Sequence, residues 1–118
     1  MTNKEVVAEY MQGFRETDHA RILACLTDDV EWYMPGYFHH KGIDAFDKEI
    51  ENDAFTGSPA IAIFRMTEEG DVVIAEGAVQ CTMKSGFVLD ALFCDVFEMR
   101  GGRISKLITY QVNKIPAA

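Results

Sequence analysis

The carboxyl group of Asp95 interrupts an otherwise apolar strand pattern and is the group best suited to do chemistry. Alternate positions in the run 87–99 carry Phe87, Leu89, Ala91, Phe93, Asp95, Phe97 and Met99. Alternate side chains of a strand share one face. An ionised carboxylate in such surroundings is costly, so Asp95 must be protonated, bonded to a donor or open to a pocket. Two interpretations follow: an ion pair with Arg65, Arg103 or Lys106, or a position that lines a pocket.

Other kinds of reactive site are not indicated. Cys25, Cys81 and Cys94 form no C-x-x-C pair and have no histidine at ligand spacing, so they predict neither a disulfide framework nor a zinc site. We interpret them as small buried hydrophobic residues. Ser105 has no evident base for nucleophilic catalysis, and the sequence contains no glycine-rich phosphate loop. We therefore expect no metal and no cofactor.

Two helices are predicted at the start of the chain. Thr2 and Glu5 fit a capping box, and an apolar stripe follows at three- and four-residue spacing. That stripe comprises Val6, Val7, Tyr10, Met11 and Phe14. Asp18 can cap a second helix, which is predicted to end near Thr27. Its stripe would comprise Ile22, Leu23 and Leu26.

The rest of the chain predicts one more helix and a set of strands. A first strand is expected over 29–34, then a loop over 37–41 and a third helix. The inner face of that helix would carry Ile43, Phe46, Ile50 and Phe55. Further strands are predicted over 60–67, 72–83, 87–99 and 103–112, separated by short turns. Helices first and an antiparallel meander second predict a single α+β domain over residues 1–118.

The strand over 87–99 is mainly apolar on both faces, which predicts that it is covered on both sides. The strand over 72–83 has one unbroken apolar face, with Glu76 and Gln80 on the other. Helices can cover one side of the sheet. An uncovered apolar face several strands wide would be a large exposed patch, so we expect a second subunit there and a homodimer.

The composition excludes several classes of function. The 118 residues include 11 basic and 19 acidic side chains, a formal net charge of −8. This balance disfavours nucleic acid as a partner, because phosphate binding needs clustered lysine and arginine. No segment approaches the roughly 20 apolar residues of a membrane span, and the first residues do not form a secretory signal. We therefore expect a cytoplasmic protein.

Two segments carry short motifs of a known family. The first runs from Tyr10 through Asp18, Asp28, Asp29 and Val30 to Pro35. The second runs from Gly86 through Asp95, Val96 and Phe97 to Gly102, Arg103 and Ile104. In both, the chain resembles the nuclear transport factor two-like superfamily, in the branch of ketosteroid isomerase and the SnoaL-like polyketide cyclases. The resemblance implies a cone-shaped α+β barrel: three helices over a strongly curved antiparallel sheet that encloses an apolar cavity, with a dimer through the outer sheet face.

The resemblance also implies roles for individual residues. Tyr10 falls where the isomerase has its oxyanion-hole tyrosine, and Asp95 falls at the protonated aspartic acid of that hole, which an apolar site keeps neutral. The proton-shuttling aspartate would fall at Met34, and a thioether cannot take a proton. Glu76, which the family's register places on the cavity face, or His39, on the loop over the expected cavity mouth, could move the proton instead.

The alternatives for these bases are structural. Glu76 could lie in solvent or pair with Arg65, and His39 and His40 could be ordinary surface residues. The cavity itself is expected to be lined mainly by apolar side chains. The predicted lining residues are Phe14, Trp32, Met34, Phe38, Phe46, Gln80, Phe93, Phe97, Leu107 and Thr109.

The sequence thus predicts a small-molecule pocket protein of the SnoaL-like or ketosteroid isomerase-like type. The ligand is expected to be a hydrophobic carbonyl-containing or polycyclic compound, and the chemistry a proton transfer of isomerase, cyclase or lyase type. Met34 at the usual base position favours an alternative, a non-catalytic ligand carrier or sensor. A third interpretation is a structural dimerisation module whose pocket is filled by its own side chains.

Overall fold

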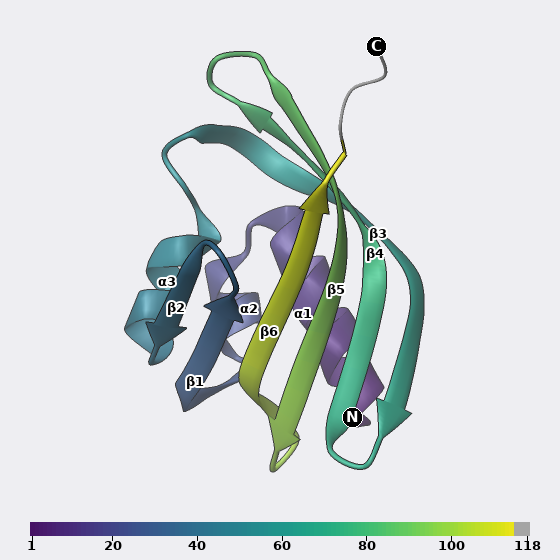
Figure 1. Ribbon diagram of the computed structural model, residues 1–118. Coiled ribbons are helices and arrows are strands. Elements are labelled where there is room, and N and C mark those ends of the chain that lie inside the picture. Colours follow the sequence, from purple (N-terminus) through teal and green to yellow (C-terminus); the bar gives the residue numbers. More distant parts are fainter. Residues whose placement is uncertain (115–118) are drawn as a thin grey trace.

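Three helices pack against the concave face of one curved six-stranded sheet (Figure 1). The structure is a computed structural model and describes residues 1–114. The helices are α1 (Asn3–Glu16), α2 (His19–Leu23) and α3 (Ile43–Ile50). The strands are β1 (Leu26–Met34), β2 (Phe38–Lys41), β3 (Phe55–Glu69), β4 (Val72–Met83), β5 (Val88–Arg100) and β6 (Arg103–Asn113). The predicted α+β class is confirmed.

The long helix α1 begins where the sequence predicts and presents the predicted stripe to the sheet. The Glu5 backbone N–H donates to the Thr2 hydroxyl at 3.1 Å, and the Thr2 backbone N–H donates to the Glu5 carboxylate at 2.9 Å, so the capping box is confirmed. Val6, Val7 and Tyr10 are buried on the inner side of the helix. This packing carries Tyr10 onto the concave face of the sheet.

Three element boundaries differ from the predictions. The second helix ends at Leu23, and Leu26 already pairs with Ile104 in the sheet. The expected loop over 37–41 is mostly strand β2, which pairs with β1. Phe55 starts β3 opposite Met83 and does not belong to the third helix. For Leu26 and Phe55, pairing with a distant strand outweighs a local apolar spacing that fits either element. Strand β2 forms because the chain turns back after Met34 and pairs with β1.

The sheet has the order β2-β1-β6-β5-β4-β3, so β2 and β3 are free edges. It curves strongly, as the predicted cone-shaped fold requires, and its two edges do not close on each other. The pairing of β1 with β6 is parallel, whereas every other pairing is antiparallel. β1 and β6 lie far apart in the sequence. Their pairing places Trp32 of β1 beside Leu107 of β6.

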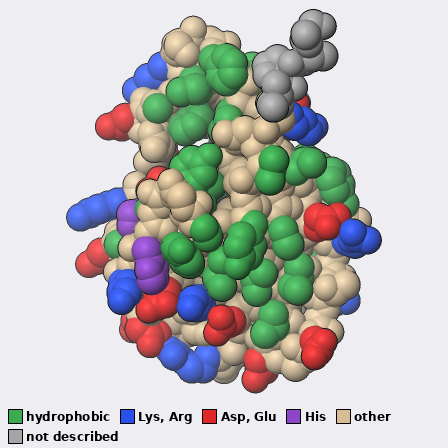
Figure 2. Space-filling view, viewed as in Figure 1, with side chains coloured by type: hydrophobic (Ala, Val, Ile, Leu, Met, Phe, Trp, Pro, Cys, Tyr) green, Lys and Arg blue, Asp and Glu red, His purple; other side chains and the backbone are tan. Residues whose placement is uncertain are grey.

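The two faces of β5 separate as the strand alternation predicts. Ala91, Phe93, Asp95, Phe97 and Met99 are all buried on the concave side. The opposite face of the sheet is open, and Figure 2 shows its hydrophobic side chains gathered over the middle strands with charged side chains around the margin. Within residues 1–114, no helix is both long and apolar enough to span a membrane. A cytoplasmic location stays a prediction.

Candidate functional site

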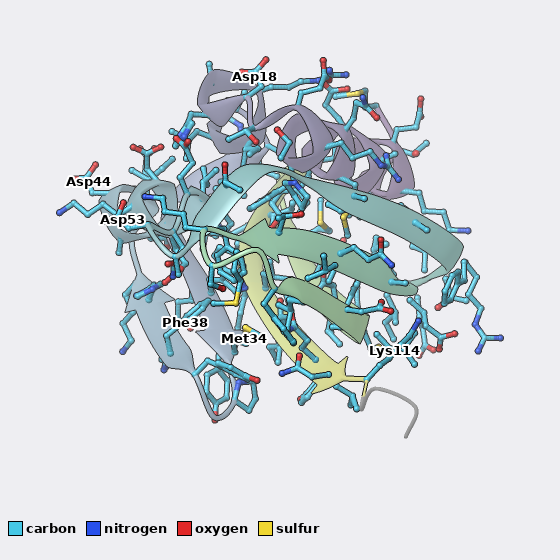
Figure 3. The ribbon with its side chains drawn as sticks, turned by 90° about the horizontal axis from the view of Figure 1, so that it is seen from above. Asp18, Met34, Phe38, Asp44, Asp53 and Lys114 are labelled. Carbon is cyan, nitrogen blue, oxygen red and sulfur yellow. The ribbon has the colours of Figure 1, made fainter. Side chains whose placement is uncertain are left out.

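A small cavity of about 100 Å³ lies between α1 and the concave face of the sheet. Six elements contribute to its wall, which is mainly apolar and aromatic. The lining residues are Tyr10, Met11, Phe14, Trp32, Ile61, Val79, Phe93, Asp95, Thr109 and Gln111. The curvature of the sheet around this interior is visible in Figure 3, where α1 lies along one side.

Asp95 is the only carboxyl group in this wall, and it is 7% exposed. Its direct cross-strand neighbours are Ala75 on β4 and Thr109 on β6. The Oδ1 atom is fully buried and has no hydrogen-bond partner among residues 1–114. Burial raises the pKa of Asp95 from 3.8 to about 7, and the nearby Thr109 hydroxyl only partly opposes this rise. The group therefore changes its charge near neutral pH.

Thr109 is held in place by Trp32, whose indole Nε1–H donates to the Thr109 hydroxyl oxygen at 3.0 Å. The hydroxyl proton of Thr109 is then free to point elsewhere, and Asp95 is its neighbour on the inner face. Trp32 is itself stacked on Phe46 of α3, with ring centroids 4.5 Å apart. The polar corner of the pocket is thus positioned by an aromatic pair behind it.

Tyr10 brings a phenol into the same pocket from α1. Its side chain is 2% exposed, and no hydrogen bond of its hydroxyl is found within the described part of the chain. Burial, and then the charge of Asp95, raise the pKa of Tyr10 well above its usual value, so it stays protonated. Tyr10 and Asp95 together can donate a hydrogen bond and exchange a proton.

The structure places the predicted lining residues in three groups. Phe14, Trp32, Phe93 and Thr109 are part of the cavity wall. Five others lie outside its wall: Phe46, Phe97 and Leu107 are buried in the core behind it, and Met34 and Phe38 lie on the β1–β2 side of the molecule (Figure 3). Gln80 is exposed and does not face the cavity, so its prediction is wrong.

The two predicted bases lie on the outside of the sheet, so neither can move a proton in this cavity. Glu76 is the cross-strand partner of Cys94 on the outer face, and it pairs with Arg65 at 3.1 Å. The inner face of β4 carries Val73, Ala75 and Val79 instead, because consecutive side chains alternate.

His39 is exposed on β2, with its ring against Tyr33. Its Nε2 atom lies 3.8 Å from Glu31. The Nε2 atom of the next residue, His40, is hydrogen-bonded to the Glu49 carboxylate of α3, at 2.8 Å. Neither histidine lines the cavity, which corrects the expectation of a base on a loop over its mouth.

The alternative of an ion pair for Asp95 is also excluded. Arg65 pairs with Glu76, and Lys106 lies 3.9 Å from Glu31 on the outer face. No Asp95 ion pair is found within residues 1–114, and no group of three His, Cys, Asp or Glu side chains there could hold a metal ion.

Four lining residues escaped the sequence predictions: Met11, Ile61, Val79 and Gln111. Gln111 lies two residues after Thr109 and therefore on the same face of β6, so strand alternation alone could have identified it. Met11 belongs to the predicted apolar stripe of α1. Ile61 could not be found this way, because irregular pairing on both sides of it obscures the register of β3.

A family model described as "SnoaL-like domain" matches residues 7–107. No curated protein matches the chain.

Solved structures share the fold at low sequence identity. An LEH-like epoxide hydrolase from M. tuberculosis aligns with a TM-score of 0.82 at 19% identity, covering 93% of this chain and 82% of that one. A putative polyketide cyclase from Xanthomonas campestris pv. campestris aligns with a TM-score of 0.83 at 22% identity, covering 92% and 88%. TerC, co-crystallised with polyporic acid, aligns with a TM-score of 0.81 at 23% identity, covering 95% and 91%.

Proposed function

The chain belongs to the SnoaL-like domain family, as its resemblance predicted, and from this premise we propose that it transfers a proton on a small hydrophobic carbonyl compound. The observation that carries this proposal is the setting of Asp95. Its carboxyl is buried in an aromatic pocket, has an unpartnered oxygen and titrates near neutral pH. Perturbed carboxyl groups in clefts are frequent at catalytic sites.

In the proposed reaction Asp95 transfers the proton and Tyr10 stabilises the charge that develops on the substrate. The Asp95 carboxylate takes a proton from the carbon next to the substrate carbonyl, and the electron pair of the C–H bond moves into a C=C bond. Negative charge then develops on the carbonyl oxygen, where the Tyr10 hydroxyl donates a hydrogen bond. The Asp95 carboxylic acid finally returns the proton to the same or another carbon. Asp95 serves as base here because Met34, Glu76 and His39 do not face the pocket.

The size and lining of the pocket narrow the substrate. A volume of about 100 Å³ lies well below the roughly 300–1,000 Å³ of pockets for drug-sized ligands, so it favours a compound with a few heavy atoms or a single small ring. Structural neighbours named as a polyketide cyclase and as a protein co-crystallised with polyporic acid support a carbonyl-containing substrate. The absence of any basic residue from the wall disfavours anionic substrates.

Proton transfer can be measured as exchange of substrate protons in D₂O, followed by NMR over a panel of small cyclic ketones and enones. We expect the wild-type protein to accelerate exchange, with a rate that rises as Asp95 ionises around pH 7. Asp95→Asn should lower that rate by about a hundredfold. Tyr10→Phe should lower it by about tenfold, the effect of one lost hydrogen bond.

The matched control is Asp90→Asn, which makes the same substitution on β5 at an outward-facing carboxylate paired with Lys114 at 3.4 Å. It should exchange like the wild type. Exchange no faster than buffer over the whole panel would contradict the catalytic proposal. Stabilisation of the wild type by those ketones, by about 2.7 kcal/mol at a hundredfold the dissociation constant, would then identify a non-catalytic carrier or sensor.

We also propose that two copies pair through the outer face of the sheet. Cross-strand rows on this face join Ile74, Val96 and Ile108, and Ala78, Leu92 and Val112. Leu92 and Val112 are 42% and 68% exposed. Both signs of charge lie at the margin, in the pairs of Arg65 with Glu76 and Lys114 with Asp90, so a two-fold axis can match opposite charges.

The oligomeric state tests this pairing directly. We expect a dimer at micromolar concentration by light scattering, and a monomer after Leu92→Glu, because a buried unpaired charge opposes association. The control is Ala8→Glu, which adds the same charge to an exposed position on α1, behind the sheet in Figure 1. A monomeric wild-type protein, or a Leu92→Glu variant that stays dimeric, would contradict the proposal.

A further inference from the structure

Among the described residues 1–114, the pocket wall contains one carboxyl group and no lysine, arginine or histidine to balance its charge. The Asp95 Oδ1 atom is fully buried without a partner. Burial raises the pKa of Asp95 and the Thr109 hydroxyl lowers it, and no charged residue contributes to the shift. Above neutral pH the pocket therefore holds an uncompensated negative charge. A ligand that carries its own positive charge would relieve this cost.

The rest of the wall suits an alkylated cation. Phe14 lies against Tyr10 with ring centroids 5.0 Å apart and planes at 55°. It also meets Trp32 edge to face, at 5.9 Å and 79°. Rings set at steep angles form a corner rather than a stack. Aromatic faces attract ammonium groups whose charge is spread over alkyl substituents, and cages of such rings are known sites for quaternary ammonium ligands.

We propose that this pocket also binds small organic cations, protonated or quaternary amines, with the ammonium group beside the Asp95 carboxylate and its alkyl groups against the aromatic walls. The cavity volume of about 100 Å³ is smaller than the roughly 150 Å³ cavity that holds a benzene ring, so it suits a compact group such as an alkylated ammonium. The net charge of −8 also favours the approach of cations. This inference rests on the pocket geometry and does not depend on proton-transfer activity.

The other charged side chains on the elements around the pocket have partners of their own and do not contact Asp95. On α1, the Arg15 guanidinium is held by the Ile61 carbonyl at 3.0 Å and by the Gln12 side-chain oxygen at 3.2 Å. Tyr10, on the same helix, stays protonated.

The strands behind the pocket turn their charges outward. Glu31 of β1 lies by Lys106 of β6, and Arg65 of β3 pairs with Glu76 of β4. The Cys94 thiol, adjacent to Asp95 on β5, faces the outer side, and burial raises its pKa so that it stays neutral. No described charge thus competes with a bound cation.

The test compares choline with its neutral carbon analogue 3,3-dimethylbutanol, which has nearly the same shape without the charge. Binding is followed by NMR titration of labelled protein in amine-free buffer, with sodium chloride matching the ionic strength. At about pH 8.5, where Asp95 is ionised, choline should bind at least about tenfold tighter than the alcohol. Near pH 5.5 this preference should largely disappear, because Asp95 then holds its proton.

Asp95→Asn keeps the shape of the side chain and removes its charge. It should lower choline affinity at about pH 8.5 by about tenfold or more and leave the alcohol nearly unaffected. Asp90→Asn should change neither. Equal binding of choline and the alcohol by the wild type, undiminished choline binding by Asp95→Asn, or shifts confined to residues outside the pocket would overturn the inference. Failure of choline to bind while ketone exchange persists would refute the cation site alone.

Discussion

The wild-type protein is expected to lose up to about 4 kcal/mol of stability relative to the Asp95→Asn variant as the pH rises from about 4 to about 8. The reason is the buried carboxyl. Its pKa is about 7 in the folded protein and 3.8 without burial. Each pKa unit corresponds to about 1.4 kcal/mol, so a rise in the pKa of Asp95 from 3.8 to about 7 corresponds to about 4 kcal/mol.

The direction follows from proton binding. Between pH 3.8 and about 7, folded Asp95 holds its proton while the unfolded chain has released it. The folded state therefore binds more protons, and the free energy of unfolding falls as pH rises through this window. Above pH 7 the full cost of a buried charge is present. Carboxyl groups with lowered pKa values, such as Asp29 beside Arg100, act in the opposite direction.

Urea unfolding at a series of pH values measures this effect as the difference between the two proteins. Groups that both proteins share cancel in that difference, including His19, whose pKa is raised by Asp47 and Glu51. Buffers must be free of amines, because a bound cation would offset the charge. A constant difference between wild type and Asp95→Asn across the whole pH range would show that Asp95 is not buried as described.

The second large effect is expected from Phe46→Ala, which should lower the free energy of unfolding by about 4 kcal/mol. Phe46 is fully buried on α3 and stacks on Trp32 at 4.5 Å. Its removal leaves a cavity that the rigid sheet cannot fill. It also frees the ring of Trp32, whose indole holds Thr109 beside Asp95.

Trp32 is the single tryptophan of the chain, so its fluorescence reports on this site. We expect a red-shifted emission in Phe46→Ala together with the loss of stability. Phe64→Ala is the matched control: Phe64 is 59% exposed, and its truncation should change stability by less than about 0.5 kcal/mol. Similar losses in both variants would contradict the role of Phe46 as the support behind Trp32.

The inner face of β5 could be predicted from the sequence alone. Its alternation placed Asp95 among Phe93, Phe97 and Met99, and the structure confirms that these four side chains are buried together. A strand has a period of two, so residues on one face are identified from the sequence without knowledge of the partner strands. The capping box of α1 was equally local and equally predictable.

Glu76 shows where that reasoning ends. Alternation separates it correctly from Val73 and Ala75, but it does not say which of the two sets faces the helices. The resemblance suggested the wrong side, and packing against α1 selected the apolar set. The predicted boundary between α2 and β1 was wrong for a related reason. Leu26 fits the apolar stripe of a helix, and only its pairing with Ile104 shows that it belongs to a strand.

The fold class, the family and the presence of one carboxyl on an apolar face could be predicted without the structure, because these depend on residues close together in the chain. Tertiary packing established that no lysine or arginine among residues 1–114 pairs with Asp95, that Met34 and Glu76 are outside the cavity, and how small that cavity is. Those properties depend on contacts such as Trp32 with Thr109, 77 residues apart. Only packing brings such pairs together, and the resulting desolvation is what makes Asp95 titrate near neutral pH.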